Sequence, residues 1–499
     1  MFRKVLITNR GEIAVRLVRA LRELGIASVA VYSDADRKAL HVRLADEAAH
    51  VGAPPSSESY LRMDRILDAA RKHGADAIHP GYGFLSENAE FAAACEDQGL
   101  AFIGPPPRAI RRLGSKTEAR RLAKHVGVPV VPGTEEPATH LDDARRVARQ
   151  LGYPVMLKAA AGGGGKGMRR VDTEQEIEAA LRDAASEAQR AFGSDEIYIE
   201  KLIVNPRHIE IQLIGDLEGN IIHLGERECS MQRRHQKVLE ECPSPLLCQR
   251  PQLRDRMGEA AVSLARASGY ANAGTAEFLV DADGRFYFLE MNTRLQVEHP
   301  VTELVTGFDL VHLQLRAAAG EPLGIRQSDV RWQGAAMECR VYAEDPDRGF
   351  FPSPGRIIHL REPAGPGVRV DSGVYGGWDI PLDYDPLLAK LVVHAPDRAA
   401  AIARTLRALE EYAVTGVTTN LAFFRDLLCD PEFAAGRLHT GFLDEFMCRR
   451  SKVPPDPRLD YLAAAVAAVH TRETAPGRAE PDPIHASRWV REGRRFMLR

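Results

Sequence analysis

The sequence predicts an α/β fold with a parallel sheet in its N-terminal part, followed by regions of the α+β type. Helix-length segments separate four short strand-like segments, a pattern typical of βαβ units. These segments lie at 5–8, 28–32, 77–78 and 101–103. Further along, apolar and polar residues alternate at 208–214, and a hairpin pattern spans 273–292. Both patterns indicate antiparallel strands.

The composition bounds the class of protein. The chain has 499 residues, 44% of them apolar and 27% charged, with a formal net charge of −3. These values are typical of a globular protein of roughly three domains, and they indicate neither a nucleic-acid partner nor a membrane anchor. The seven cysteines include no C-x-x-C pair, so we expect a cytoplasmic protein without disulfides. No apolar run is long enough for a signal peptide or a membrane span.

The N-terminal segments predict the first elements in order. Apolar residues recur at helical spacing from Ile13 until Gly25 ends the pattern. Two loops rich in glycine and proline, 79–84 and 104–107, follow the last two strands of this part. Because ligands bind at the carboxyl ends of parallel strands, these loops are candidate binding segments. Neither contains G-x-G-x-x-G, so a nicotinamide cofactor is not indicated.

The rest of the chain mixes helices and strands. We expect a helix at 116–126, strands at 154–158, 197–203, 208–214 and 221–226, and a long helix at 252–268. In the strand at 208–214, the alternation of Ile209, Ile211 and Leu213 predicts one buried face and one solvated face. A mixed β region follows at 333–447, and a change of composition marks an appended tail at 448–499.

A glycine-rich loop follows the strand at 154–158. Five glycines lie between Lys158 and Met168, and such a backbone can approach a ligand closely and turn N–H groups toward an anion. The lysines at its two ends suit phosphate. Taken alone, the loop is equally well a flexible linker.

The hairpin at 273–292 predicts a metal site. Asp283 and Gly284 are a strong signal for a two-residue type I′ turn, and this turn would place Glu277 directly opposite Glu290. Two facing carboxylates repel each other unless a cation lies between them, and oxygen ligands suit Mg²⁺. The alternatives are an exposed acidic pair or a different register.

A row of polar residues follows the hairpin. An extended backbone would project the residues of one parity to one side: Glu290, Asn292, Arg294, Gln296 and Glu298. In such a row Arg294 could bind a small oxyanion, and Glu298 could serve as a general base. The alternative is a solvated strand face.

A second polar cluster spans 226–237. On the residues alone it is predicted to be a solvated charged loop, and Cys229 within it to be structural.

Taken together, these motifs closely resemble biotin carboxylase, a member of the ATP-grasp superfamily. The resemblance covers 1–447, about nine-tenths of the chain. The matching segments, in the family's order, are NRGEIA at 9–14, HPGYGFLSEN at 79–88, KAAAGGGGKGM at 158–168, ECSMQRRHQK at 228–237, EMNTRLQVEHP at 290–300, ECR at 338–340 and FPSPG at 351–355.

The resemblance implies four parts. They are an N-terminal Rossmann-like domain at 1–114, an ATP-grasp domain at 115–332 with a mobile lid at about 131–203, a C-terminal mixed β domain at 333–447, and the tail at 448–499. Ala161 and Lys166 depart from the glycine and arginine of many members, which affects the lid rather than the chemistry.

The resemblance also implies a role for each matching position. The nucleotide contacts would be Lys116, Lys158, Gly164, Gly165, Met168, Glu200, Lys201, Leu202, Ile203, His208, Gln232 and His235. The ligands of Mg²⁺ or Mn²⁺ would be Glu277, Glu290 and Asn292. The bicarbonate and biotin pocket would contain Tyr82, Lys237, Arg294, Gln296, Val297, Glu298 and Arg340, of which Lys237, Arg294, Glu298 and Arg340 would be catalytic.

The implied reaction is the ATP-dependent carboxylation of biotin by bicarbonate, through carboxyphosphate. This is the first half-reaction of an acyl-CoA carboxylase, such as the acetyl-CoA carboxylase of fatty acid biosynthesis, or of pyruvate carboxylase. No biotin-attachment motif is present, so the biotin would arrive on a separate biotin carboxyl carrier protein. A homodimer and a carboxyltransferase partner are implied as well. The alternatives are another ATP-grasp ligase and a catalytically silent scaffold protein.

Overall fold

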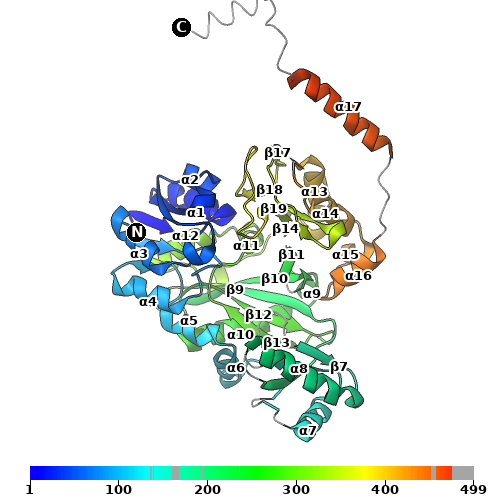
Figure 1. The fold of residues 1–499 in the computed structure, drawn as a ribbon. Helices are drawn as coiled ribbons and strands as arrows, with labels where there is room; N and C mark the ends of the chain where they lie inside the picture. Colours follow the sequence, from blue (N-terminus) through cyan, green and yellow to red (C-terminus); the bar gives the residue numbers. More distant parts are fainter. Residues whose placement is uncertain are drawn as a thin grey trace, which may run out of the picture. The chain divides into compact units, whose positions relative to one another are not determined.

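The computed structural model describes residues 1–134, 137–138, 140–159, 168–192, 195–234, 236–450 and 457–474 (Figure 1). The chain divides into two compact units, Met1–Cys448 and Arg449–Arg499. The second unit has one described helix, α17 (Pro457–Thr474). Within the described ranges, no helix is both long and apolar enough to cross a membrane.

The N-terminal sheet has five parallel strands in the order β3-β2-β1-β4-β5. Its strands are β1 (Lys4–Ile7), β2 (Ala27–Ser33), β3 (Glu47–Gly52), β4 (Ala77–His79) and β5 (Ala101–Phe102). Its principal helices are α1 (Gly11–Glu23), α3 (Met63–His73) and α4 (Ala89–Asp97). This strand order is that of a doubly wound, Rossmann-like sheet, so the predicted fold class is confirmed. The edge strand β3 is absent from the sequence prediction.

An antiparallel sheet of eight strands carries most of the polar residues that matter below. Its order is β13-β12-β9-β10-β11-β14-β19-β18. The strands are β9 (Arg207–Gly215), β10 (Ile221–Arg233), β11 (Gln236–Cys242), β12 (Asn272–Val280), β13 (Phe286–Asn292), β14 (Ala335–Tyr342), β18 (Val368–Ser372) and β19 (Leu387–Ala395). Since β11 pairs with β14, the sheet continues without a break across the boundary proposed at 332/333.

One face of this sheet packs on α10 (Pro251–Ser268), and Ile209 and Leu213 of β9 lie in that core as predicted. The other face of β9 is not solvated. It carries His208, Glu210 and Gln212, all buried. The prediction of a half-buried strand is therefore wrong. Polar groups buried in this way require partners from neighbouring elements.

The predicted solvated loop at 226–237 is also wrong. Most of it belongs to β10 and β11, and β10 extends seven residues beyond the predicted end at 226. Glu226, Arg227 and Glu228 are buried in the strand. Long buried strands with charged residues are misread from sequence because each charge is assigned to solvent unless its partner is known.

The hairpin of β12 and β13 has a longer turn than predicted. Its loop has three residues and is closed by Asp281 and Arg285, with Gly284 at φ +83°. A type I turn followed by a left-handed residue has this geometry. The two-residue turn predicted from Asp283 and Gly284 is therefore wrong.

A bulge in the same hairpin compensates for the extra turn residue. Phe278 pairs with Phe288, whereas the next residue toward the site, Glu277, pairs with Glu290. Leu289 is the unpaired residue between them. The predicted pairing of Glu277 with Glu290 is thus confirmed, because the longer turn and the bulge shift the register in opposite directions.

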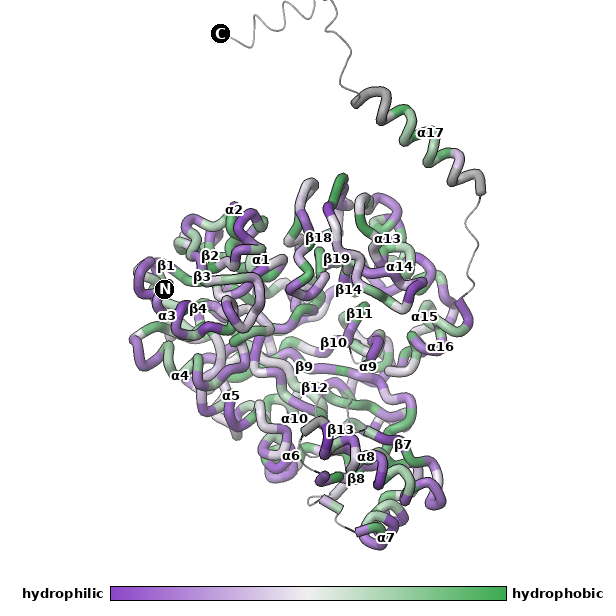
Figure 2. Tube along the Cα trace, viewed as in Figure 1, coloured by the Kyte–Doolittle hydropathy of each residue, from purple (hydrophilic) through white to green (hydrophobic). Residues whose placement is uncertain are grey.

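A smaller antiparallel sheet, in the order β7-β6-β8, lies in the expected lid region. Its elements are β6 (Val155–Ala159), β7 (Met168–Val171), β8 (Ile197–Lys201), α7 (Leu141–Leu151) and α8 (Ile177–Phe192). These elements bury an apolar cluster of their own, which includes Leu157, Ile177 and Ile199. Both hydrophilic and hydrophobic residues occur along α7 and α8 (Figure 2).

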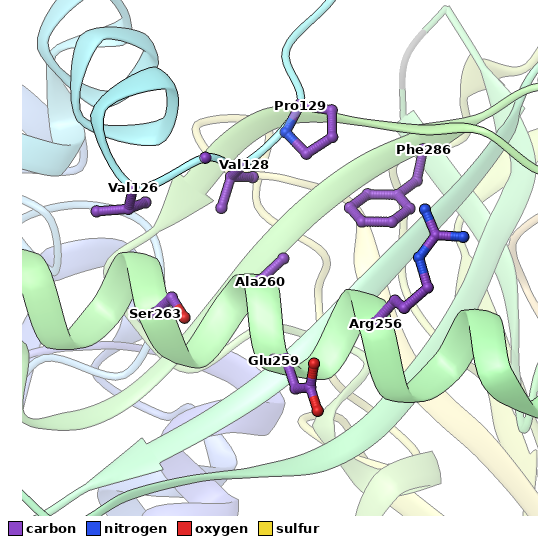
Figure 3. A pocket seen from close by; sticks show the side chains of 9 residues that line it. Val126, Val128, Pro129, Arg256, Glu259, Ala260, Ser263 and Phe286 are labelled. Carbon is purple, nitrogen blue, oxygen red and sulfur yellow. The ribbon is translucent and has the colours of Figure 1, made fainter.

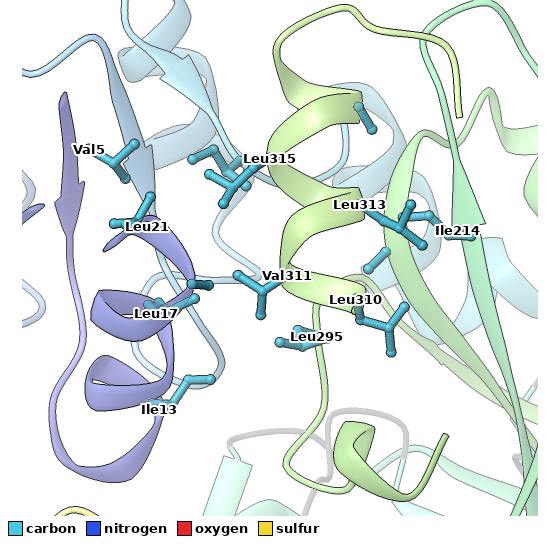
Figure 4. Close-up of a cluster of buried hydrophobic side chains, with 14 of the residues drawn as sticks. Val5, Ile13, Leu17, Leu21, Ile214, Leu295, Leu310, Val311, Leu313 and Leu315 are labelled. Atoms are coloured by element: carbon cyan, nitrogen blue, oxygen red, sulfur yellow. The ribbon is translucent and has the colours of Figure 1, made fainter. Parts of the chain in front are cut away.

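A core between α1 and α12 (Leu310–Ala318) fixes the segment that follows the hairpin. Figure 4 shows Leu295 beside Leu310 and Val311 of α12. Because Leu295 is fully buried there, its neighbours in the chain are directed to other surroundings.

The C-terminal part of the first unit completes the eight-stranded sheet. Helices α13 (Arg398–Glu411) and α14 (Leu421–Leu428) share an apolar core with β14 and β19, and α11 (His299–Thr306) packs on the opposite face of these strands.

The remaining α-helices and strands of the first unit are α2 (Leu40–Leu44), α5 (Pro107–Gly114), α6 (Lys116–His125), α9 (Pro245–Gln249), α15 (Pro431–Ala434), α16 (Phe442–Arg449), β15 (Glu344–Asp345), β16 (Phe351–Pro352), β17 (His359–Arg361) and β20 (Ala413–Thr415).

Candidate active site

Three carboxylates surround the ammonium group of Lys237, which is on β11. Its Nζ lies 2.8 Å from Glu277 Oε1 and 2.7 Å from Glu298 Oε1, and it also donates a hydrogen bond to Glu210. Glu210 and Glu277 lie on the paired strands β9 and β12. Glu298 is the residue directly before α11. Burial disfavours the charged amine, but these carboxylates hold the pKa of Lys237 well above its usual range.

Arg340 of β14 holds the other side of Glu298. Its Nη2 lies 2.8 Å from Glu298 Oε2, and its Nε donates to Glu240 Oε1 at 2.6 Å. Burial alone would favour the neutral acid, but Lys237 and Arg340 lower the pKa of Glu298 well below its usual range. Glu298 is therefore a carboxylate at neutral pH, which is the state that a general base requires.

Arg227 lies beneath these groups and is fully buried. It donates to Glu210 through Nε and to Gln296 Oε1 through Nη2 at 2.9 Å. Gln296 in turn donates to Glu277 Oε1 at 2.9 Å. This chain of hydrogen bonds fixes the side chain of Gln296 and links β9, β10 and β12 to the loop after the hairpin.

Arg294 is held from two sides. Its Nε donates to Glu87 Oε2 at 2.9 Å, and its Nη2 donates to Asn292 Oδ1 at 2.8 Å. Glu87 also accepts a bond from the backbone N–H of Thr293 at 2.9 Å. The loop after β4 therefore reaches the same site, as its position at the carboxyl end of a parallel strand predicts.

The polar row predicted on one extended face has a different backbone. The strand ends at Asn292, and residues 293–298 form a loop that leads into α11. Gln296 and Glu298 nevertheless join the network around Lys237, because Leu295 anchors the loop in the core. Arg294 instead contacts Glu87 and Asn292. The extended backbone is wrong, and the contacts group Gln296 with Glu298 and Arg294 with Asn292.

The proposed metal ligands lie together at the end of the hairpin, but basic side chains contact the two carboxylates. Glu277 contacts Lys237 and His208 Nε2, the latter at 3.0 Å. Glu290 contacts Lys116 at 3.1 Å. The amide nitrogen of Asn292 is buried and has no hydrogen bond within the described residues. Two carboxylates and an amide oxygen on adjacent strands are a donor set that fits Mg²⁺.

Most of the described residues expected to bind nucleotide lie on or directly after β6, β7, β8, β9 and β10, while Lys116 begins α6. Lys158 and Arg120 both contact Glu200 of β8, and Met168 pairs with Lys158 across β6 and β7. The ammonium group of Lys201 does not join this cluster and donates a hydrogen bond to Gly152 O at 2.8 Å.

The structure gives less detail for the other residues expected to contact the nucleotide. Leu202 is tied by its backbone N–H to Pro154 O at 3.1 Å, and the adjacent Ile203 is half-buried. Gln232 pairs with Lys237 across β10 and β11. Gly164, Gly165 and His235, together with Ala161 and Lys166, lie outside the described residues.

The buried ion pair of Glu12 and Lys390 links Tyr82 to Val297. The hydroxyl of Tyr82 donates to Glu12, and Lys390 Nζ donates to the carbonyl oxygen of Val297 at 2.9 Å. Lys390 also contacts Glu12 Oε2 at 3.1 Å, and its side chain is fully buried. Asp371 completes this cluster. The N-terminal helix α1 and the strand β19 are thereby joined at the loop that holds Glu298.

Sequence reasoning missed several of these residues. Glu210, Arg227, Glu240 and Lys390 are buried charges within strands, and Glu87 lies in the loop after β4. A signal existed for Glu210: it shares parity with His208 and Gln212 on β9, and this polar face was read as solvated. Cys229 lies near the carboxylates of Glu210 and Glu298, and burial raises the pKa of its thiol well above the usual range, which keeps it neutral.

A separate cavity of about 260 Å³ lies on the other side of the sheet (Figure 3). It is lined by α10 residues such as Arg256 and Glu259, by the segment 126–129 and by Phe286. No residue of the candidate site is among those that line it.

Three family models match the chain in order. "Biotin carboxylase, N-terminal domain" matches 1–110, "Carbamoyl-phosphate synthase L chain, ATP binding domain" matches 115–326, and "Biotin carboxylase C-terminal domain" matches 338–445. A biotin carboxylase of Nostoc sp. is 53% identical over 444 residues, covering 89% of this chain and 99% of that protein. The chain belongs to the biotin carboxylase family. Its ATP-dependent, ADP-forming ligase class and its activity of biotin carboxylation are thereby confirmed.

Two further relatives differ in the larger enzyme they serve. The propionyl-CoA carboxylase alpha chain of Ruegeria pomeroyi is 50% identical over 492 residues, covering 94% of this chain and 72% of that protein. The biotin carboxylase domain dimer of Hydrogenobacter thermophilus 2-oxoglutarate carboxylase, solved with MgADP, ADP and bicarbonate, superimposes with a TM-score of 0.84. It is 47% identical and covers 91% of this chain and 100% of the solved chain.

Proposed function

We propose that the group formed by Lys237, Arg294, Gln296, Val297 and Glu298 binds bicarbonate beside ATP and starts its carboxylation chemistry. The observation that carries this proposal is the position of Glu298 between Lys237 and Arg340, at 2.7 Å and 2.8 Å. Two cations keep the carboxylate ionised, and Arg294 adds a planar cation that suits a small oxyanion.

In the proposed first step, Glu298 accepts the proton of bicarbonate, and a bicarbonate oxygen attacks the γ-phosphorus of ATP. The O–P bond to ADP breaks and carboxyphosphate forms. Lys237 and Arg294 offset the negative charge that the two anions bring together. The hydrogen bonds of Arg227 and Gln296 hold the side chains of this group in a fixed arrangement, which favours the step.

In the proposed second step, carboxyphosphate breaks down to CO₂ and phosphate. The phosphate removes the N1′ proton of biotin, and the resulting enolate attacks CO₂. Arg340 would stabilise the enolate, and Tyr82 would lie on the biotin side of the same pocket. Support comes from the contact of Arg340 with Glu298, the residue proposed as the base.

The nucleotide and metal assignments are part of the same proposal. ATP would contact the residues expected from the sequence: Lys116, Lys158, Gly164, Gly165, Met168, Glu200, Lys201, Leu202, Ile203, His208, Gln232 and His235. Glu277, Glu290 and Asn292 would hold Mg²⁺ or Mn²⁺, which when bound draws negative charge from the phosphates. The contacts of Lys116 with Glu290 and of Lys237 with Glu277 show that these carboxylates attract positive charge.

The proposed assembly is a homodimer that receives biotin on a carrier protein and passes the carboxyl group to a carboxyltransferase partner. The solved relative is named as a dimer, and no biotin-attachment motif occurs in this sequence. The relatives belong to pyruvate, propionyl-CoA and 2-oxoglutarate carboxylases, so acetyl-CoA and a role in fatty acid biosynthesis are one choice among several. We place the enzyme in the cytoplasm, which suits its seven unpaired cysteines.

ADP release by the purified chain tests the proposal. With Mg²⁺, ATP, bicarbonate and free biotin all present, ADP should form, and omission of either bicarbonate or biotin should greatly reduce it. Lys237→Ala and Arg294→Ala should abolish the bicarbonate-dependent part. Turnover that ignores biotin would indicate another ATP-grasp ligase, and nucleotide binding without turnover would indicate a scaffold protein.

A further inference from the structure

Two buried glutamates face each other beside the candidate site. Glu240 on β11 pairs directly with Glu338 on β14, and both residues are 0% exposed. Directly opposite residues in an antiparallel pair have Cβ atoms about 5 Å apart and share one face of the sheet. On that face Arg340 follows Glu338 along β14, and Lys390 lies opposite Arg340 on β19.

The pair has fewer partners than two carboxylates require. Glu240 Oε1 accepts from Arg340 Nε at 2.6 Å. Its other oxygen, and both oxygens of Glu338, are buried without a hydrogen bond to any described residue. A buried carboxylate without hydrogen-bond donors is costly, whereas a carboxylic acid supplies its own donor.

The charged groups around the pair do not compensate for two negative charges. Lys237 and Arg340 already flank Glu298, and Lys390 is engaged with Glu12 and Asp371. His299, the first residue of α11, is buried, and its pKa lies well below the usual range, so it adds no positive charge. Two carboxylates that share a buried site keep one proton between them.

We propose that Glu240 and Glu338 share a single proton, held on Glu338, so that the negative charge stays on Glu240 beside Arg340. The O–H of Glu338 would then face the oxygen of Glu240 that has no other partner. Burial raises the pKa of Glu240 to about 7 and that of Glu338 well above its usual range, in agreement with a proton that prefers Glu338.

The shared proton has a consequence for the site, and this consequence rests on the proposed function. Arg340 divides its guanidinium between Glu240 and Glu298. Loss of the proton would add a second negative charge on the Glu240 side, which would draw Arg340 from Glu298 and Lys390 from the carbonyl of Val297. Glu240 and Glu338 are therefore positioning residues that act through Arg340 and Lys390.

Infrared spectroscopy tests the proton without reference to activity. Relative to the wild-type protein at pH 7, Glu338→Gln should lose the carbonyl stretch of one protonated carboxyl, a band that shifts in D₂O. Glu240→Gln should instead lose one carboxylate stretch and keep that carbonyl band. If one variant fails to fold, the other carries the test. Loss of a carboxylate stretch in Glu338→Gln, or of the carbonyl band in Glu240→Gln, would overturn the proposal.

The pH profile of kcat/KM for biotin tests the consequence. The wild-type enzyme should lose activity on the alkaline side as the pair releases its proton, and Glu338→Gln, which cannot ionise, should move this limb upward by at least one pH unit. Glu241→Gln is the matched control, since Glu241 is buried on the same strand but contacts Arg398. An unmoved limb in Glu338→Gln would refute the positioning role. Absence of biotin carboxylation in the wild-type protein would instead refute the proposed function.

Discussion

Lys237 Nζ lies 2.7 Å from Glu298 Oε1, and this contact joins the central strand β11 to the loop ahead of α11. Each of the two residues is held by further partners, Lys237 by Glu210 and Glu277 and Glu298 by Arg340. These contacts fix the proposed base in position and in its ionised form.

Glu298→Gln should leave the fold intact and remove the proposed base. The amide has nearly the same shape, but it cannot accept the proton of bicarbonate. We expect kcat for bicarbonate-dependent ADP release to fall about 10²- to 10⁴-fold, with KM for ATP within about threefold of the wild-type value. Glu218→Gln at an exposed position is the control. A Glu298→Gln enzyme with normal turnover would assign the base to another residue.

Glu87→Gln should weaken the binding of bicarbonate through Arg294. The substitution removes the charge of the carboxylate that Arg294 Nε contacts at 2.9 Å. Glu87 is partly exposed, and an exposed ion pair contributes about 0.2–1 kcal/mol, so KM for bicarbonate should rise up to about fivefold. KM for ATP should change little, because neither Glu87 nor Arg294 is among the proposed nucleotide contacts. Equal increases in both constants would indicate a general distortion of the site.

Lys390→Met should destabilise the protein and disturb the loop that holds Glu298. The variant leaves Glu12 and Asp371 buried with less positive charge nearby. Breaking a buried ion pair costs about 3–5 kcal/mol, which should appear in chemical denaturation. Lys72→Met is the control, since Lys72 pairs with Asp68 on the surface and should lose less than about 1 kcal/mol. Equal losses would show that the buried cluster is not special.

Asp371→Asn should change how stability depends on pH. Burial opposes ionisation, but Arg369 and Lys390 lower the folded-state pKa of Asp371 well below the value of about 3.9 expected in the unfolded chain. Its contribution is therefore present above about pH 4 and is lost as the pH falls through the folded-state pKa. In urea unfolding at pH 7, the free energy of unfolding should be lower for the variant than for the wild-type protein. This difference should become smaller below about pH 4. A constant difference would contradict this ionisation.

The hairpin of β12 and β13 shows which features could be predicted from the sequence and which could not. Glu277 was predicted opposite Glu290, and the structure pairs them, but the turn has an additional residue and a bulge restores the register. Sequence signals specify that two strands meet at a tight turn, whereas the turn length and the bulge depend on the packing of Phe278, Phe286 and Phe288 in the core.

The buried charged residues are the part of the site that could not be predicted from the sequence. Arg227 and Glu210 read as surface residues because each is charged, and only the fold reveals that they contact each other across β9 and β10. The ionic partners of Lys390 are equally remote, since Glu12 precedes it by more than 370 positions. Pairings over such separations cannot be derived from local patterns.

The pairing of β11 with β14 has a consequence for dissection of the chain. A recombinant fragment ending near residue 332 would retain β11 but remove its neighbour, leaving a row of backbone N–H and C=O groups without partners. Such an edge recruits strands from other molecules. Expression of the nucleotide-binding half by itself should therefore yield aggregates, whereas Met1–Cys448 should remain monodisperse.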